Sequence, residues 1–106
     1  MDFIETPIFT QQVLSLLSED EYRQLQIVLM VHPDTGVIIP GSGGLHKMRW
    51  SAKGHGKRGG ARIIYYWAIS QDEIFLLFIY PKNVQDDLTP DQLKALRQVV
   101  KEKYYG

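Results

Sequence analysis

The amino-acid sequence predicts an α+β fold: a small antiparallel sheet of mixed edge, with two N-terminal helices and one C-terminal helix. Two helix-start signals precede short apolar stripes in the first third of the chain, and strand-like apolar segments follow between residues 45 and 80. A third helix-start signal precedes a last apolar stripe near the C-terminus. The expected order is therefore β-α-α-β-β-β-α, with helices packed against the sheet.

The composition is that of one globular domain, which we expect to span residues 1–106. Hydrophobic residues make up 44% of the chain and charged residues 23%, and both values are ordinary for such a domain. A chain of this length buries roughly two thirds of its unfolded surface, so one core is feasible without covalent cross-links. The chain has no cysteine, which excludes disulfides, cysteine-based zinc sites and thiol catalysis.

The chain offers no membrane signal. Its longest apolar run, residues 74–80, is far shorter than the about 20 residues that a membrane-spanning helix needs. The first residues lack the basic region and apolar segment of a signal peptide. We therefore expect a cytoplasmic protein with no membrane partner. Because the net charge is zero, indiscriminate nucleic-acid binding is not expected, and any basic surface must be local.

The N-terminal third predicts an edge strand followed by two helices. Residues 2–5 form the short strand, and Thr6-Pro7 is a capping residue with proline at the first helical position. The first helix is expected to stop near Ser18 and to bury three apolar residues, Val13, Leu14 and Leu17. Ser18 and Glu21 form a capping box for the second helix. That helix carries the apolar stripe Tyr22, Leu25, Val28 and Leu29 and ends at His32-Pro33.

The remaining elements follow from turn signals and apolar patterns. Residues 34–44 are a connecting loop, and two strands flank the glycine-rich loop of residues 51–60. Residues 74–80 are apolar on both faces, which is typical of a strand covered on both sides. Thr89 and Gln92 repeat the capping box before a final helix, whose apolar positions are Leu93, Leu96, Val99 and Val100.

Residues 44–69 are the most informative segment because they hold half of the Lys and Arg residues of the chain. Six cations lie within sixteen positions: Lys47, Arg49, Lys53, Lys57, Arg58 and Arg62. No Asp or Glu occurs between Asp34 and Asp72. A run of basic residues in a loop is often only a solvated surface. Here, however, the charges alternate with apolar residues on predicted strands, which favours a binding surface.

The alternation predicts where these cations point. On an extended strand Lys47 and Arg49 share one face, while Met48 and Trp50 share the other. If this strand pairs as a hairpin with the strand that Arg62 begins, the cations of both converge on one open surface. We expect that surface to be concave and to have no neighbouring carboxylate, and such a surface suits a phosphodiester backbone.

Other chemistries fit less well. Gly56-Lys57 resembles part of a phosphate-binding loop, but Arg58 replaces the required Ser or Thr and Ser51 replaces the first glycine. The three histidines, His32, His46 and His55, have no metal-ligand spacing, so we expect no metal and no cofactor. His55 lies in the basic loop and titrates near neutrality, which makes it a candidate for proton transfer or RNA contact.

RNA cleavage without metal remains compatible with these residues. The RNA 2′-hydroxyl attacks the adjacent phosphorus when a base removes its proton, cations stabilise the added charge, and an acid protonates the departing 5′-oxygen. A lysine crowded by other cations has a lowered pKa, because like charges disfavour its protonated form. A Lys and Arg cluster can therefore supply both the base and the electrostatic clamp.

These residues resemble a known family. The strand Gly43-Gly44-Leu45-x-Lys47-x-Arg49, the loop of residues 53–60 and the strand of residues 62–66 are similar to the RelE superfamily of bacterial toxins, and most similar to its HigB-type members. The similarity covers nearly the whole chain. It implies an endoribonuclease, a messenger RNA interferase, that enters the ribosomal A site and cuts mRNA during translation. It also implies a cognate antitoxin, with operator DNA contacted only through the antitoxin complex.

The resemblance also implies roles for individual residues. Lys47 and Arg49 correspond to two strand residues that act in proton abstraction and phosphate binding, and Arg62 to an arginine that stabilises the transition state. Lys82 corresponds to a basic residue just past the fourth strand. The loop is longer than in the best-known members, so Lys53 or Lys57 can replace a strand lysine, and Arg58 is an expected RNA contact.

Some alternatives remain open on the sequence. Tyr104 and Tyr105 either stack on a substrate base or merely pack, and the general acid is not identified. The ParE toxins share this fold but poison DNA gyrase and have no ribonuclease site. A non-catalytic module that grips RNA or DNA with the same basic surface is the third possibility.

Overall fold

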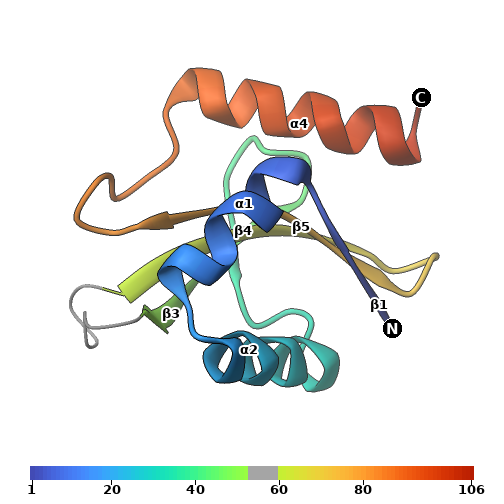
Figure 1. Cartoon of the computed structure of the whole chain (residues 1–106). Helices are drawn as coiled ribbons and strands as arrows, with labels where there is room; N and C mark the ends of the chain where they lie inside the picture. Colours follow the sequence, from blue (N-terminus) through green and yellow to red (C-terminus); the bar gives the residue numbers. More distant parts are fainter. Residues whose placement is uncertain (53–59) are drawn as a thin grey trace.

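The computed structural model describes residues 1–52 and 60–106, which form a mixed five-stranded sheet with helices on both faces (Figure 1). The strands are β1 Asp2–Glu5, β2 Val37–Ile38, β3 Leu45–Ala52, β4 Gly60–Ala68 and β5 Glu73–Pro81, in the spatial order β1-β5-β4-β3-β2. The helices are α1 Pro7–Leu16, α2 Glu19–Val31 and α4 Pro90–Tyr104. β1 pairs with β5 in parallel, and the other pairs are antiparallel. The α+β class and the mixed edge predicted from the sequence are confirmed.

The sheet separates two apolar clusters. On one face, α1 and α2 bury Phe9, Leu17 and Leu25 against side chains of the strands such as Ile63. On the other face, α4 buries Leu96 and Val100 against a second set of strand residues. In Figure 1 this division is visible as α4 above the sheet and α2 below it. As expected, β5 is covered on both sides, because it contributes alternate residues to the two clusters.

The helices begin where local capping chemistry predicts. Ser18 Oγ accepts from the Glu21 N–H at 3.0 Å, and the Glu21 carboxylate accepts from the Ser18 N–H at 2.7 Å. Thr89 and Gln92 form the same reciprocal pair at the start of α4. The second helix ends at Val31, next to the predicted His32-Pro33 boundary. These contacts satisfy backbone N–H groups that the first helical turn leaves without partners.

The buried face of α1 differs from the prediction. Leu14 was expected in the core but is 51% exposed, whereas Phe9 is fully buried. Thr6 explains the difference, because its hydroxyl donates to the Leu77 carbonyl of β5 at 2.8 Å and also caps α1 by accepting from the Phe9 N–H. This anchor sets the rotation of α1 on the sheet, and Phe9 and Val13 then face inward.

The connection predicted as a loop contains the two-residue strand β2. Val37 pairs with Lys47 and Ile38 with His46, so β2 forms the sheet edge beside β3. The preceding turn is held by Tyr65, whose hydroxyl donates to the Pro33 carbonyl and accepts from the Gly36 N–H, both at 2.8 Å. The partner of β2 is β3, so the residues of β2 alone did not indicate that this segment joins the sheet.

His46 gives the fold a predicted pH dependence. Its side chain is buried, stacks on Tyr65 at 5.0 Å between ring centroids, and donates from Nδ1 to the Gly44 carbonyl. Burial lowers its pKa from the model-compound value of 6.5, while the Gly44 carbonyl and Asp34 act in the opposite direction. The folded state therefore favours the neutral ring, and the unfolded chain binds more protons below pH 6.5. Stability should fall as the pH drops through and below this value.

Denaturant unfolding at about pH 7.5 and about pH 5.5 measures this effect, since the interval spans the titration of a free histidine. His46→Gln should reduce the difference in unfolding free energy between the two pH values. His32→Gln is the matched control, because His32 is exposed. An undiminished difference in His46→Gln would refute the assignment.

Candidate nucleic-acid interface

The pairing of β3 with β4 gathers cations at one end of the sheet. Arg49 lies opposite Arg62, and Lys47 lies opposite Ile64. Because directly opposed residues of an antiparallel pair share a face, Lys47, Arg49 and Arg62 lie on the same side of the sheet. Ile64 belongs to the cluster under α4, so this is also the α4 side. We call these three residues the strand cations.

Lys82 lies near the same end of the sheet. Its N–H donates to the Gly60 carbonyl at 3.1 Å, which joins the end of β5 to the beginning of β4. The side chains of Lys82 and Arg49 are exposed, and that of Lys47 is partly exposed. The strand cations and Lys82 therefore lie near one end of the sheet, where β5 ends and the chain continues toward α4.

The expectation that this surface has no neighbouring carboxylate is wrong. The connection between β5 and α4 folds back over the strand cations, where Asp87 forms an ion pair with Lys47 and Asp86 lies 3.9 Å from an Arg62 nitrogen. The hydrogen bond and charge of Lys47 lower the pKa of Asp87. The absence of Asp and Glu between Asp34 and Asp72 therefore did not make the surface free of carboxylates, because Asp86 and Asp87 come from a segment that is distant in sequence.

Arg62 is also less open than expected. It was predicted to face an open site, but it is 3% exposed. Its strand lies between β3 and β5, and its neighbours across those two strands are Arg49 and Tyr80. One guanidinium nitrogen donates to the Ala61 carbonyl at 3.4 Å. The guanidinium is therefore buried among the strands with the Asp86 carboxylate beside it, and we call this buried position the recess.

Tyr80 is a polar group of this recess that the sequence analysis missed. It lies directly opposite Arg62, is 3% exposed, and donates from its hydroxyl to the Asp86 carbonyl at 3.2 Å. Burial, with the nearby charge of Asp87, raises its pKa to about 12, although Arg62 acts in the opposite direction. The hydroxyl is thus protonated at neutral pH and can donate a proton. The sequence did offer one signal for Tyr80, which ends an apolar run immediately before Pro81.

Four predicted site residues cannot be placed. Lys53, His55, Lys57 and Arg58 lie outside the described residues. They belong to the connection between β3 and β4, whose described ends are Ala52 and Gly60. Their proposed roles therefore stay predictions from the sequence.

The two C-terminal tyrosines lie away from Arg62. Tyr104 packs on Tyr66 and Phe75 and donates to the Glu73 carboxylate at 2.7 Å. Tyr105 shares a hydrogen bond with the Tyr66 hydroxyl. Because Tyr66 is four residues along β4 from Arg62, roughly 13 Å separates these positions on the strand. Packing is therefore the interpretation that the geometry favours for Tyr104.

Residues 1–52 and 60–106 contain neither a metal-binding cluster nor a membrane-spanning helix. No cluster of three or more His, Cys, Asp or Glu residues there could hold a metal ion. No helix in the same two segments is long and apolar enough to cross a membrane.

A sheet flanked by helices, with cations of a β-hairpin gathered at one end, is an arrangement suited to binding a phosphodiester backbone. Comparison with known families agrees with the architecture. Residues 39–105 match the family described as the RelE toxin of the RelE/RelB toxin-antitoxin system. The matched segment is more than half of the sequence and includes β3, β4, β5 and the whole of α4. The chain belongs to the RelE toxin family, so it is the toxin component of a toxin-antitoxin system and its partner there is an antitoxin.

Proposed function

We propose that this toxin is a ribosome-dependent endoribonuclease that cuts mRNA in the ribosomal A site and thereby blocks translation. The observation that carries the proposal is the register that sets Arg49 opposite Arg62 and places Lys47 on the same face. General RelE activity supports it further. Assignment to the HigB-type subgroup stays a prediction, as does contact with operator DNA through the antitoxin complex.

The proposed reaction needs no group beyond this chain and the RNA. Once Asp87 is displaced, the neutral amine of Lys47 accepts the proton of the 2′-hydroxyl, whose oxygen then attacks the adjacent phosphorus. Arg49 and Arg62 stabilise the charge that develops on the non-bridging oxygens. Tyr80 donates its proton to the departing 5′-oxygen, which leaves a 2′,3′-cyclic phosphate and a new 5′-hydroxyl end. Lys82 and the cations of residues 53–59 are proposed to add electrostatic stabilisation.

The carboxylates beside the strand cations must move before RNA binds in this way. The side chains of Asp86 and Asp87 are 71% and 72% exposed. Each pair therefore has a solvated carboxylate, whose attraction to its cation is weakened by hydration and screened by salt. An RNA backbone brings several phosphates at once, and multiple charge-assisted contacts can replace these two pairs. Displacement of the connection between β5 and α4 would also uncover the Tyr80 hydroxyl.

Induction of the protein in growing bacteria tests the proposed function. New 5′ ends would be mapped on a well-translated message and on the same message without its start codon. We expect cleavage of the translated message only, because the proposed substrate is mRNA in the A site. Uninduced cells provide the background.

Other results would support a different function. Growth arrest with intact mRNA would contradict the nuclease and favour a gyrase poison, which a supercoiling assay would then reveal. Absence of both arrest and cleavage would favour a non-catalytic nucleic-acid-binding module.

A further inference from the structure

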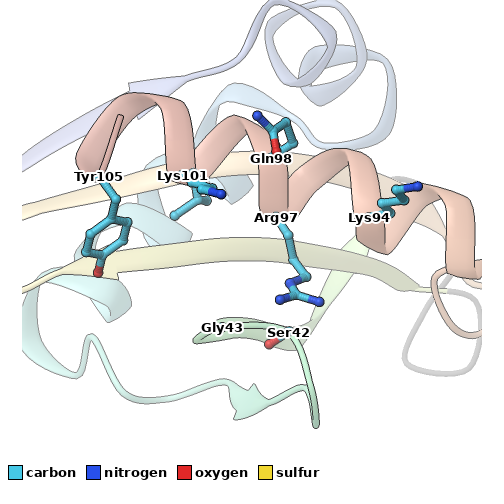
Figure 2. Close-up of a pocket in the computed structure, with 8 residues that line it drawn as sticks. Ser42, Gly43, Lys94, Arg97, Gln98, Lys101 and Tyr105 are labelled. Carbon is cyan, nitrogen blue, oxygen red and sulfur yellow. The ribbon is translucent and has the colours of Figure 1, made fainter.

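A basic hollow of about 320 Å³ lies between α4 and the turn that precedes β3 (Figure 2). Its lining residues are Ser42, Gly43, Lys94, Arg97, Gln98, Val100, Lys101 and Tyr105. Three of them are cations, and none is a carboxylate. The hollow is separate from the strand cations, because none of Lys47, Arg49 and Arg62 lines it.

The three cations form one row because of their helical spacing. Lys94, Arg97 and Lys101 are three and four residues apart, so they lie on the same side of α4. Figure 2 shows Arg97 extending from the helix toward Ser42 and Gly43 on the opposite wall. Gly43 has a φ of +74°, and a Cβ built there would lie at ordinary contact distance, 4.0 Å, from Arg97 Nε, so the two walls approach each other here. The Arg97 side chain is itself exposed.

The chemistry of the lining favours a phosphate backbone over a protein segment. Protein–protein interfaces are depleted in lysine, and two of the three cations that line the hollow are lysines. Here Val100 is buried in the core, and the remaining wall is cationic or small and polar apart from Tyr105, which is 69% exposed. Cations with an adjacent hydroxyl and an exposed aromatic ring suit phosphates and a neighbouring base.

We propose that this hollow binds the backbone of the same RNA strand that the strand cations hold, at a point several nucleotides from the scissile phosphate. This inference rests on the proposed function. Gly43 precedes Lys47 by four residues, but Gly43 and Gly44 belong to the turn before β3, so the two positions lie no more than roughly 13 Å apart. A stacked strand advances about 3.4 Å per nucleotide, so the hollow lies within about four nucleotides of Lys47. The hollow thus extends the RNA-binding site without taking part in the chemistry.

Binding of non-cleavable RNA tests the proposal separately from cleavage. The probes are fluorescent 2′-O-methyl oligoribonucleotides of about 2 and about 12 nucleotides, of which only the longer can reach from the strand cations into the hollow. The double variant Arg97→Gln/Lys101→Gln should bind the longer probe on the order of 10- to 30-fold more weakly at about 0.1 M salt. The slope of log affinity against log salt should fall by about 1.4, or ~0.7 for each lost phosphate contact. Affinity for the shorter probe should stay unchanged.

Arg23→Gln/Lys103→Gln is the matched control, because it removes one Arg and one Lys, the latter also from α4, without touching the hollow. It should retain the affinity and salt slope of the wild type. Unchanged binding of the longer probe by Arg97→Gln/Lys101→Gln would overturn the proposal, and so would an equal loss for both probe lengths. If the double variant bound intact ribosomes more weakly but kept the wild-type ratio of affinities for the two probes, the hollow would not bind the same RNA strand as the strand cations. If the wild-type protein bound the longer probe more tightly than the shorter one but cleaved no translated mRNA, the result would support RNA binding by the hollow. It would refute the proposed nuclease activity.

Discussion

Replacement of Arg62 should reduce mRNA cleavage by at least about 100-fold, as expected when a positioned donor to a developing negative charge is lost. The guanidinium is the cation in the recess beside Tyr80, and no described cation is buried as deeply. Arg62→Lys keeps the charge and much of the volume but removes the planar pair of donors that suits two phosphate oxygens. The rate of cleavage of a translated message in a purified translation system, with wild type and variant compared, measures the loss.

Stability must be measured alongside activity. Because Arg62 is 3% exposed, Arg62→Ala leaves a gap in the sheet and an unpaired Asp86, and we expect it to lower the unfolding free energy by about 1 to 3 kcal/mol. Arg62→Lys should be closer to the wild type in stability. Arg23→Ala is the control, since Arg23 lies on α2 and forms only an exposed pair with Asp20 among its described contacts. A folded Arg62→Lys or Arg62→Ala variant with full activity would refute the proposed role.

Removal of the two carboxylates should strengthen RNA binding on the order of tenfold. In Asp86→Asn/Asp87→Asn, the strand cations lose their internal counter-ions, and the RNA phosphates no longer approach two negative charges. Asparagine keeps the size of the side chain, so the change is mainly electrostatic. Affinity for a 2′-O-methyl oligoribonucleotide, measured by fluorescence anisotropy at several salt concentrations, checks this expectation. The gain should shrink as salt rises, because screening weakens both the attraction and the repulsion.

A matched pair of acids controls for net charge. Glu19→Gln/Asp20→Asn removes two adjacent exposed carboxylates from the start of α2 and raises the net charge equally. If this variant gains as much affinity as Asp86→Asn/Asp87→Asn, the effect is one of overall charge and the local competition is refuted. If neither variant gains affinity, the carboxylates do not compete with RNA.

Local chemistry explains which predictions succeeded. Ser18 with Glu21 and Thr89 with Gln92 are capping pairs whose members are three residues apart, so the helix starts depend on contacts within one turn. The alternation of Lys47 and Arg49 with Met48 likewise reflects the pleat of a single strand. Where the deciding contact was remote, as with Thr6 and Leu77, the pattern misjudged the buried face of α1.

The sequence by itself therefore determined the α+β class, the starts of the helices and the presence of cations on paired strands, because each depends on neighbouring residues. Only the tertiary structure decided what surrounds those cations. Lys47 and Asp87 are 40 positions apart, and Arg62 meets Tyr80 only through the register of β4 with β5. The path of the connection between β5 and α4 is set by packing of α4 on the sheet, and no local pattern encodes it. For that physical reason the carboxylates over the strand cations, the burial of Arg62 and the basic hollow beside Gly43 became visible only in the folded protein.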